Sequence, residues 1–240
     1  MTPLSTSLRE AMAKQTSPEK IRVFSRFFKT GPGQYGEGDQ FWGLSVPTVR
    51  ALVKPHTHPD LDDIIDLLAD PVHEVRLAGG LLLVNGYQKA KGAAKEPFYD
   101  CYMANTTRFN NWDLVDLTCY NVVGDWLYNK DRAPLFALAD SDNLWEQRIA
   151  MVSTMYFIRK GDYSTTLALA DKLLHHTHDL MHKAVGWMLR EVGKRDIEVE
   201  KAFLLEGDRY RTMPRTTLRY AIERFPEPER LLFLKGMASF

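Results

Sequence analysis

The segment NNWDLVDLTCYNVVGDW, residues 110–126, places an indole and a carboxylate one helical turn apart. Trp112 and Asp116 are spaced i, i+4, so a helix would carry both side chains on one face. Asp116 falls at the edge of an apolar stripe, where a carboxylate is costly unless it is paired or used. The stripe consists of Val115, Cys119, Val122, Val123 and Trp126.

Trp187 and Arg148 could complete a site with this pair. Two indole faces and one carboxylate in a groove attract a cationic ligand, through cation–π attraction and ion pairing. An arginine beside them is suited to a phosphate attached to that ligand. The structural alternative is a core Trp112 next to an Asp116 that Arg148 neutralises.

The elements that must position these residues are helices. Proline stands at or near several expected first turns, where its missing N–H costs nothing. The segments between them have a helical period and almost no strand-like alternation, which predicts a nearly all-α chain. The proline positions are Ser17-Pro18, Ser45-Val46-Pro47, Asp70-Pro71, Ala133-Pro134 and Met213-Pro214.

Similar helices recur along the chain. Their starts lie 33 to 36 residues apart, around Arg76, Trp112, Arg148, Lys183 and Thr216. An interval of this length has room for two helices, which predicts a stack of helical hairpins forming one domain over residues 1–240. Such stacks curve, so we expect the repeated second helices to line a concave surface. Trp112, Asp116, Arg148 and Trp187 would face that surface together.

The composition is that of an ordinary soluble protein. The 240 residues include 31 basic and 31 acidic side chains, so the whole-molecule charge indicates neither a nucleic-acid nor a membrane partner. Charge is clustered locally, acidic over residues 60–74 and basic over residues 201–224. We expect Cys101 and Cys119 to be small buried hydrophobic residues. A signal peptide and a long apolar run are both missing, which favours a cytoplasmic location.

Three other motifs do not carry the function. The loop TGPGQYGEGD lacks the flanking strand and the Lys-Ser/Thr of phosphate-binding loops, so we expect a structured turn. The histidines of HHTHDLMH have no Cys or carboxylate partner in a zinc pattern and fit a solvated connection between helices better. No GxSxG elbow occurs. We therefore expect neither a metal nor a cofactor.

Five segments in order resemble the AlkD-type DNA alkylation repair proteins, which are HEAT-like helical-repeat DNA glycosylases. They are GQYGEGD, NNWDLVD, LWEQRIA, HKAVGWMLREVGKRD and PRTTLRYAIER, and the likeness extends from about residue 18 to residue 236. The resemblance implies that Asp116 is the catalytic carboxylate, that Trp112 and Trp187 pack on the deoxyribose, and that Arg148 holds a phosphate.

The activity implied by the resemblance is excision of positively charged N3- and N7-alkylpurines from double-stranded DNA by a monomer, without flipping of the base. Basic residues on the repeat helices would bind the duplex, namely Arg148, Arg190, Lys194, Arg215 and Arg219. Two alternatives are a non-catalytic module that binds damaged or branched DNA and a protein-binding HEAT scaffold. Asp116 argues against a pure DNA binder, because its charge would repel phosphates.

Overall fold

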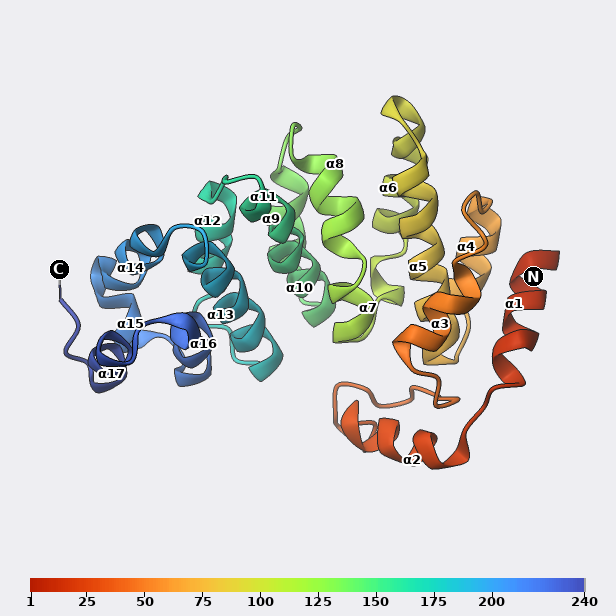
Figure 1. Cartoon of the computed structure of the whole chain (residues 1–240), viewed down its shortest axis with the longest axis horizontal. Coiled ribbons are helices and arrows are strands. Elements are labelled where there is room, and N and C mark those ends of the chain that lie inside the picture. The colour runs from red at the N-terminus through yellow and green to blue at the C-terminus, as the bar shows by residue number, and fades with distance from the viewer. Residues whose placement is uncertain (240) are drawn as a thin grey trace. The chain divides into compact units, whose positions relative to one another are not determined.

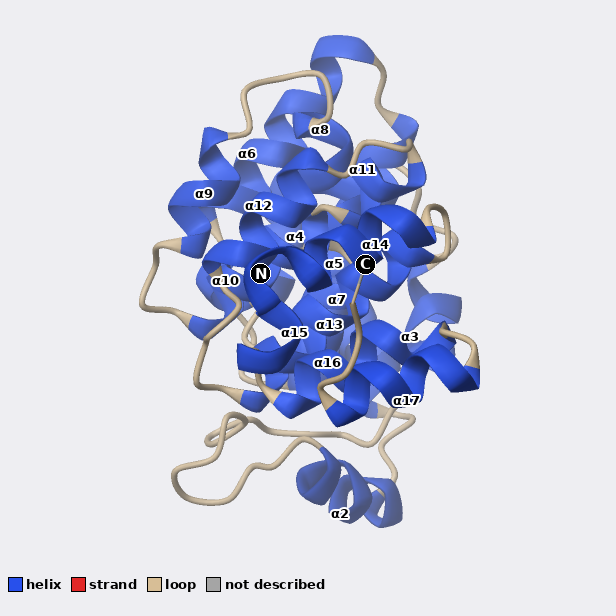
Figure 2. Ribbon diagram, turned by 90° about the vertical axis from the view of Figure 1, so that its left-hand side faces the viewer, coloured by secondary structure: helices blue, strands red, loops and turns tan. Residues whose placement is uncertain are grey.

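The computed structural model describes residues 1–239, in which every regular element is a helix (Figures 1 and 2). Over these residues the only β-type pairing is an isolated parallel bridge between Gln40 and Val72. The all-α prediction is confirmed. The chain consists of two compact units, Met1–Trp126 and Leu127–Phe240.

The first unit is built from helices that alternate along the chain with short turns and one long loop, residues 28–45. The elements are α1 (Pro3–Ala13), α2 (Pro18–Phe27), α3 (Val46–Val53), α4 (Leu61–Leu68), α5 (His73–Lys89), η1 (Gly92–Lys95), α6 (Glu96–Ala104), η2 (Thr106–Arg108), α7 (Trp112–Asp116), the π-helix η3 (Tyr120–Gly124) and α8 (Asp125–Leu127), which ends at the first residue of the second unit.

The second unit continues with helices of similar length. Its elements are α9 (Ala133–Ala139), α10 (Leu144–Ser153), α11 (Met155–Arg159), α12 (Ser164–Lys172), α13 (Asp179–Gly193), α14 (Ile197–Leu205), η4 (Glu206–Asp208), α15 (Arg209–Thr212), α16 (Arg215–Ala221), η5 (Ile222–Arg224) and α17 (Glu227–Lys235). In the part of the chain that the structure describes, no helix has the length and apolar character needed to cross a membrane.

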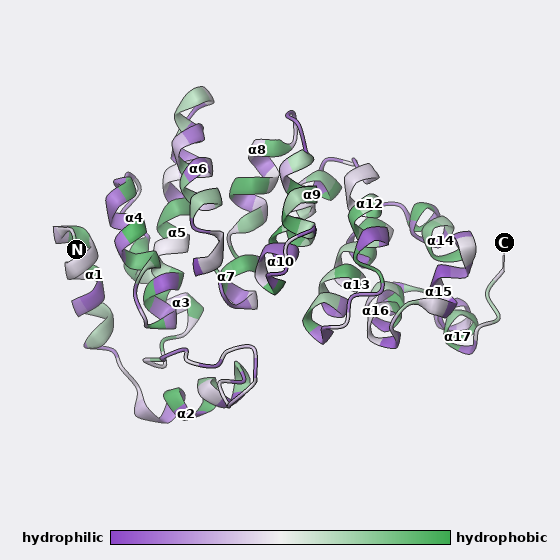
Figure 3. Cartoon of the chain, turned by 180° about the vertical axis from the view of Figure 1, so that it is seen from behind, coloured by the Kyte–Doolittle hydropathy of each residue, from purple (hydrophilic) through white to green (hydrophobic). Residues whose placement is uncertain are grey.

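Consecutive helices pack as hairpins, as the repeats predict. α4 packs on α5 in the first unit, while α9 packs on α10 and α12 on α13 in the second. The predicted repeat starts open α5, α7, α10, α13 and α16. Of these, α5, α10 and α13 are the second helices of the packed pairs, and α13 also packs closely on α16. Figure 3 shows hydrophobic and hydrophilic residues alternating around most helices, the pattern expected when each helix buries one face on its neighbours. The helical-repeat prediction is confirmed.

Proline marks helix starts where expected. α2 begins at Pro18, and α3 and α9 each have proline at the second position. Ser45 caps α3, because its hydroxyl accepts a hydrogen bond from the backbone N–H of Thr48 at 3.4 Å.

The segment 110–126 is interrupted where a simple helix would be continuous. α7 ends at Asp116, and a π-helical stretch begins at Tyr120. Between them Thr118 donates its hydroxyl to the carbonyl of Leu114 at 2.6 Å, an interaction that competes with the helical ladder. The expected stripe is buried nevertheless: Val115, Cys119, Val122 and Val123 have no exposed surface, and Trp126 is half-buried. Cys101 is also buried, and neither cysteine forms a disulfide bond.

The Gly-rich loop is fixed to the start of α5. The buried carboxylate of Glu74 accepts hydrogen bonds from the backbone N–H groups of Trp42, Gly43 and Leu44 at 3.0, 2.7 and 3.1 Å. Gly43 adopts φ +80°, and a Cβ there would lie 2.7 Å from the carbonyl oxygen of Ser17. The loop is therefore a structured turn, as predicted, and it holds α2 against the rest of the unit.

Candidate functional site

Trp112 and Asp116 line one pocket of about 530 Å³ in the first unit. α2, α3, α5 and α7 all contribute to its walls, so it lies between α2 and the starts of α3, α5 and α7. Both side chains are half-buried. The other lining residues are Phe24, Phe27, Phe28, Leu44, Ser45, Val46, Pro47, His73, Glu74, Leu77, Asp113 and Leu117.

The pocket has an aromatic wall that α2 and the residue after it provide. The ring of Phe28 stacks on the indole of Trp112, with centroids 5.4 Å apart and an interplanar angle of 26°. The ring of Phe27 meets the same indole edge to face at 5.7 Å. Phe28 is buried, whereas Phe27 is 60% exposed. Trp112 is thereby fixed in orientation, and an exposed aromatic edge borders the pocket.

A buried ionic network lies behind this wall. The imidazole of His73 is 2.9 Å from Asp113 through Nε2 and 3.4 Å from Asp39 through Nδ1. Arg76 donates to Asp39 at 2.6 Å. The side chains of His73, Arg76, Asp39 and Asp113 are each 6% exposed or less. The network joins the Gly-rich loop, the start of α5 and the start of α7.

The two carboxylates determine the charge of His73. Burial alone would lower the pKa of this imidazole, but the charge and hydrogen bond of Asp113, together with Asp39, raise the pKa to about 9. Burial would likewise raise the pKa of Asp39, yet its hydrogen bond to His73 and the charge of Arg76 leave that pKa below its usual value. At neutral pH His73 is therefore an imidazolium between carboxylates.

The two asparagines before Trp112 also bind this loop. The amides of Asn110 and Asn111 donate to Asp39 at 3.2 and 3.5 Å. The side-chain oxygen of Asn111 caps α7 by accepting the backbone N–H of Trp112 at 2.9 Å. The NNWD sequence therefore sets where α7 begins and which way Trp112 points.

The other predicted residues lie in the second unit, beginning with Arg148. Its side chain on α10 is buried, at 5% exposed, and its Nη1 donates to the carbonyl of Leu180 at 2.6 Å. Arg148 thus ties α10 to the start of α13.

Trp187 and Arg190 belong to α13, and both are half-buried. Gly186, the residue before Trp187, allows α16 to pack closely on α13. A Cβ at this position would lie 2.5 Å from both the carbonyl oxygen of Thr217 and the Cβ of Tyr220. Arg190 pairs with Glu223 and lies over the ring of Tyr220, 6.0 Å from its centroid.

The three remaining predicted residues are exposed. Lys194 pairs with Glu191 at 2.5 Å, and Arg215 donates to the carbonyl of Leu234 at 2.9 Å. Arg219 has no ion pair with any described residue. Trp112 and Asp116 are therefore assembled around one pocket of the first unit. The other six predicted residues lie in the second unit, on α10, α13 and α16 and, for Lys194, at the residue that follows α13.

The histidine cluster serves the connection between α12 and α13. His176 Nε2 is 2.8 Å from the side-chain oxygen of Gln147, and His178 caps α13 by accepting the backbone N–H of Leu180 at 3.1 Å. His182 hydrogen bonds to the carbonyl of His176. Among the residues described, no group of three His, Cys, Asp or Glu side chains is arranged to hold a metal ion.

Sequence reasoning missed Phe27, Phe28, His73, Asp113 and Asp39. The amphipathic run VFSRFF identified a helix, but its contact with Trp112 joins positions about 85 residues apart. The signal for the network was the carboxylate pair of WDLVD, in which only the second member, Asp116, was singled out.

Comparisons with known proteins agree with this fold and sequence. The profile of the family described as DNA alkylation repair enzyme matches residues 8–225. A solved structure described as a predicted DNA alkylation repair enzyme from Enterococcus faecalis superimposes with a TM-score of 0.66 at 17% identity, covering 88% of this chain and 97% of that one. At that identity the likeness shows a shared fold.

A search of curated proteins gives no significant match. The family profile nevertheless spans both units and includes the whole of the Trp112 pocket. This chain belongs to the DNA alkylation repair enzyme family.

Proposed function

We propose that this protein is a monofunctional DNA glycosylase of the AlkD type, which hydrolyses the N-glycosidic bond of cationic N3- and N7-alkylpurines in duplex DNA. The observation that carries the proposal is the half-buried carboxylate of Asp116 in an aromatic-walled pocket shared with Trp112. Membership of the family supplies alkylation repair as the role and DNA as the partner.

The chemistry needs a stabilised sugar cation more than a strong acid. An alkylated purine is already positively charged, so it leaves as a neutral base when the electron pair of the C1′–N bond returns to it. The deoxyribose then carries the positive charge. Ionised Asp116 stabilises that charge and orients a water molecule, whose oxygen bonds to C1′ and whose proton is released.

The pocket walls suit this reaction. Trp112, fixed by Phe28, presents an electron-rich indole to the sugar, and the apolar walls exclude water and so strengthen the attraction between Asp116 and the sugar cation. In this proposal Trp187 supplies a second aromatic face. Arg148, Arg190, Lys194, Arg215 and Arg219 hold the duplex through its phosphates on the concave face expected of the repeats.

The lesion is selected by its charge and lability while the base stays stacked in the duplex. The enzyme acts as a monomer in the cytoplasm, without metal or cofactor. Bulky cationic N7 adducts should therefore be released as well as methyl adducts, whereas the uncharged lesion hypoxanthine should be retained.

The experiment is an assay of base release from three duplexes of one sequence, carrying 7-methylguanine, a bulky cationic N7-guanine adduct and hypoxanthine. Release of the first two alone supports the proposal. Release of hypoxanthine with retention of the bulky adduct would indicate a size-limited base pocket and contradict it. DNA binding without release of any base would favour the non-catalytic binding module.

A further inference from the structure

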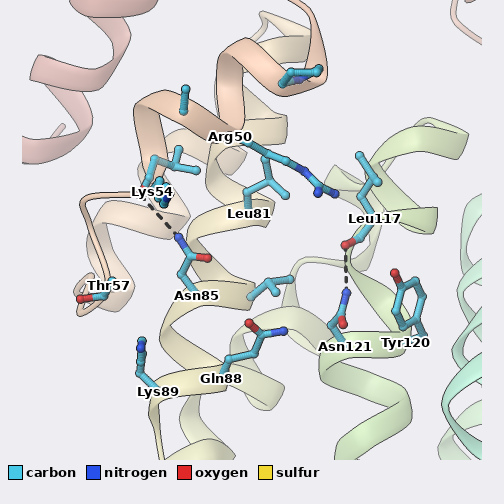
Figure 4. Close-up of a pocket in the computed structure, with 14 residues that line it drawn as sticks. Arg50, Lys54, Thr57, Leu81, Asn85, Gln88, Lys89, Leu117, Tyr120 and Asn121 are labelled. Carbon is cyan, nitrogen blue, oxygen red and sulfur yellow. Dashed lines mark hydrogen bonds between the residues drawn. The ribbon is translucent and has the colours of Figure 1, made fainter.

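A second groove of about 830 Å³ continues from the Trp112 pocket along α3, α5 and the π-helix η3 (Figure 4). Pro47 and Leu117 line both spaces, so the groove and the pocket adjoin. We call it the basic groove, because Arg50, Lys54 and Lys89 line it and no acidic residue does. Arg50 extends from α3 toward Leu117 on the opposite side (Figure 4).

The three cations of the basic groove are exposed and have no ion pair with any described residue. Basic side chains elsewhere commonly form ion pairs. Lys95 pairs with Asp125 at 2.6 Å, and Arg132 pairs with Asp162 at 2.6 Å. Two of the cations that the sequence predicts to bind DNA, Arg190 and Lys194, also have carboxylate partners. The basic groove is therefore a region of uncompensated positive charge.

Arg50 and Lys54 are four residues apart on one helix, with α3 ending at Val53 and Lys54 at its C-cap. Like charges at this spacing destabilise a helix. The C-terminal end of the helix dipole offsets part of this repulsion. A bound anion would offset the remaining repulsion between Arg50 and Lys54. Anion binding therefore explains this pair of like charges, whereas helix stability does not.

Three side-chain amides complete the groove. Asn85 donates to the carbonyl of Val53 at 3.4 Å and Asn121 to that of Leu117 at 3.2 Å, which fixes both side chains beside the cations (Figure 4). Gln88 is exposed in the same lining. Amide N–H groups and cations together are the donors that commonly bind phosphate oxygens of DNA.

The dimensions suit a strand of DNA. On α5 the Trp112 pocket is lined from His73 to Leu77 and the basic groove from Leu81 to Lys89, so the two together extend from His73 to a point sixteen residues on. At 1.5 Å per residue this is roughly 24 Å, the axial rise of about seven nucleotides of one strand.

We propose that the basic groove binds the phosphodiester backbone of duplex DNA next to the nucleotide that occupies the Trp112 pocket. Arg50, Lys54 and Lys89 neutralise successive phosphates, and the amides donate to their oxygens. The position relative to the lesion rests on the proposed glycosylase function, whereas binding to undamaged duplex does not.

The test measures the affinity for one undamaged duplex at several salt concentrations. Replacing Arg50 and Lys54 together by Gln should weaken binding by about tenfold or more near physiological salt. It should also reduce the slope of log K against log salt by about 2, roughly 0.9 for each phosphate that the variant no longer neutralises.

The matched control is Lys14→Gln combined with Lys235→Gln. These two lysines are exposed, form no ion pair with described residues and lie outside the groove, so the same net charge is removed. The control should keep the wild-type slope. Equal losses of affinity in the two double variants, or an unchanged slope in the groove variant, would overturn the proposal.

Gln88→Lys adds a cation to the groove and should tighten duplex binding and steepen the slope, a gain that misfolding cannot produce. Base release, measured in parallel, separates the two proposals. A groove effect on binding without any base release by the wild type would refute the glycosylase and leave the groove. Base release by the wild type, with no change of binding in the groove variants, would refute the groove proposal and leave the glycosylase proposal.

Discussion

His73 Nε2 lies 2.9 Å from Oδ2 of Asp113, the residue that directly follows Trp112. The same imidazole reaches Asp39 and stacks against Phe41, with ring centroids 4.7 Å apart. A protonated His73 therefore connects the Gly-rich loop to the start of α7. Because α7 carries both Trp112 and Asp116, this ionic contact fixes the helix on which the proposed chemistry depends.

His73→Gln should remove a pH-dependent part of the stability. The folded-state pKa of His73, about 9, exceeds its usual value of 6.5, so its contribution is complete below about pH 6.5 and is lost as pH rises toward 9. The variant should be less stable than wild type at pH 6, by about 1–3 kcal/mol, with the difference shrinking by pH 9. Urea unfolding of both proteins between pH 6 and pH 9 measures this difference in stability. The exposed residue His58 provides the control, His58→Gln, and a pH-independent difference for His73→Gln would contradict the account.

Phe27→Ala should affect excision more than folding. Phe27 is 60% exposed but meets Trp112 edge to face, and such aromatic pairs contribute about 0.5–1.5 kcal/mol. We expect single-turnover base release to slow roughly 2- to 10-fold with little change in thermal unfolding. Val23 on the same helix is 58% exposed and outside the pocket, so Val23→Ala should leave the rate unchanged. Equal effects of the two variants would remove Phe27 from the site.

Arg148→Ala should reduce DNA binding, base release and stability together. Its guanidinium is buried and donates to the Leu180 carbonyl, so truncation also leaves that acceptor without this donor, at a cost of about 1–3 kcal/mol. Arg219 is exposed, and Arg219→Ala should weaken binding at unchanged stability. Denaturant titrations paired with duplex titrations distinguish the two. If Arg148→Ala lowered stability alone, its proposed phosphate contact would be wrong.

Glu200→Gln should stabilise the second unit at alkaline pH. Burial raises the pKa of Glu200 to about 9, although the charge of Arg190 opposes this. The folded state keeps this proton after the unfolded chain has released it, so wild-type stability falls from about pH 4.5 to pH 9. The fall is about 1.36 kcal/mol per pH unit while only the folded state holds the proton. Calorimetry should show that the stability of the variant increases relative to that of wild type as pH rises. Glu198, whose side chain is 78% exposed, provides the control, and Glu198→Gln should show no such increase. If the stability of Glu200→Gln followed the same pH dependence as that of wild type, the raised pKa of Glu200 would be contradicted.

The helices were predictable because their signals are local. Proline positions, apolar periodicity and the 33- to 36-residue spacing depend on neighbouring residues, and they located the starts of α2, α3, α9 and the repeat helices. The π-helix after Asp116 was not predictable, since it accompanies packing between Thr118 and Tyr102, whose hydroxyls are 3.0 Å apart.

The site was predictable only where one segment contained it. Trp112 and Asp116 share α7, and their i, i+4 spacing was enough to bring them to one pocket. Phe28, which follows α2, and His73, at the start of α5, contact α7 across 84 and 40 residues of sequence, and no local pattern records such contacts. The unpaired cations of the basic groove were missed for a related reason, since a net charge of zero does not indicate which basic side chains lack an acidic partner.

The most direct test of the central claim is single-turnover release of 7-methylguanine from a duplex by wild type and Asp116→Asn, with affinity for the same duplex measured in parallel. Asn keeps the size of the side chain and removes its charge. We predict a rate lower by roughly 100-fold or more, because the sugar cation loses its counter-charge, and affinity that is equal or higher. Asp62→Asn, at an exposed position outside the pocket, should keep the wild-type rate. Wild-type release by Asp116→Asn would contradict the assignment of Asp116 as the catalytic carboxylate.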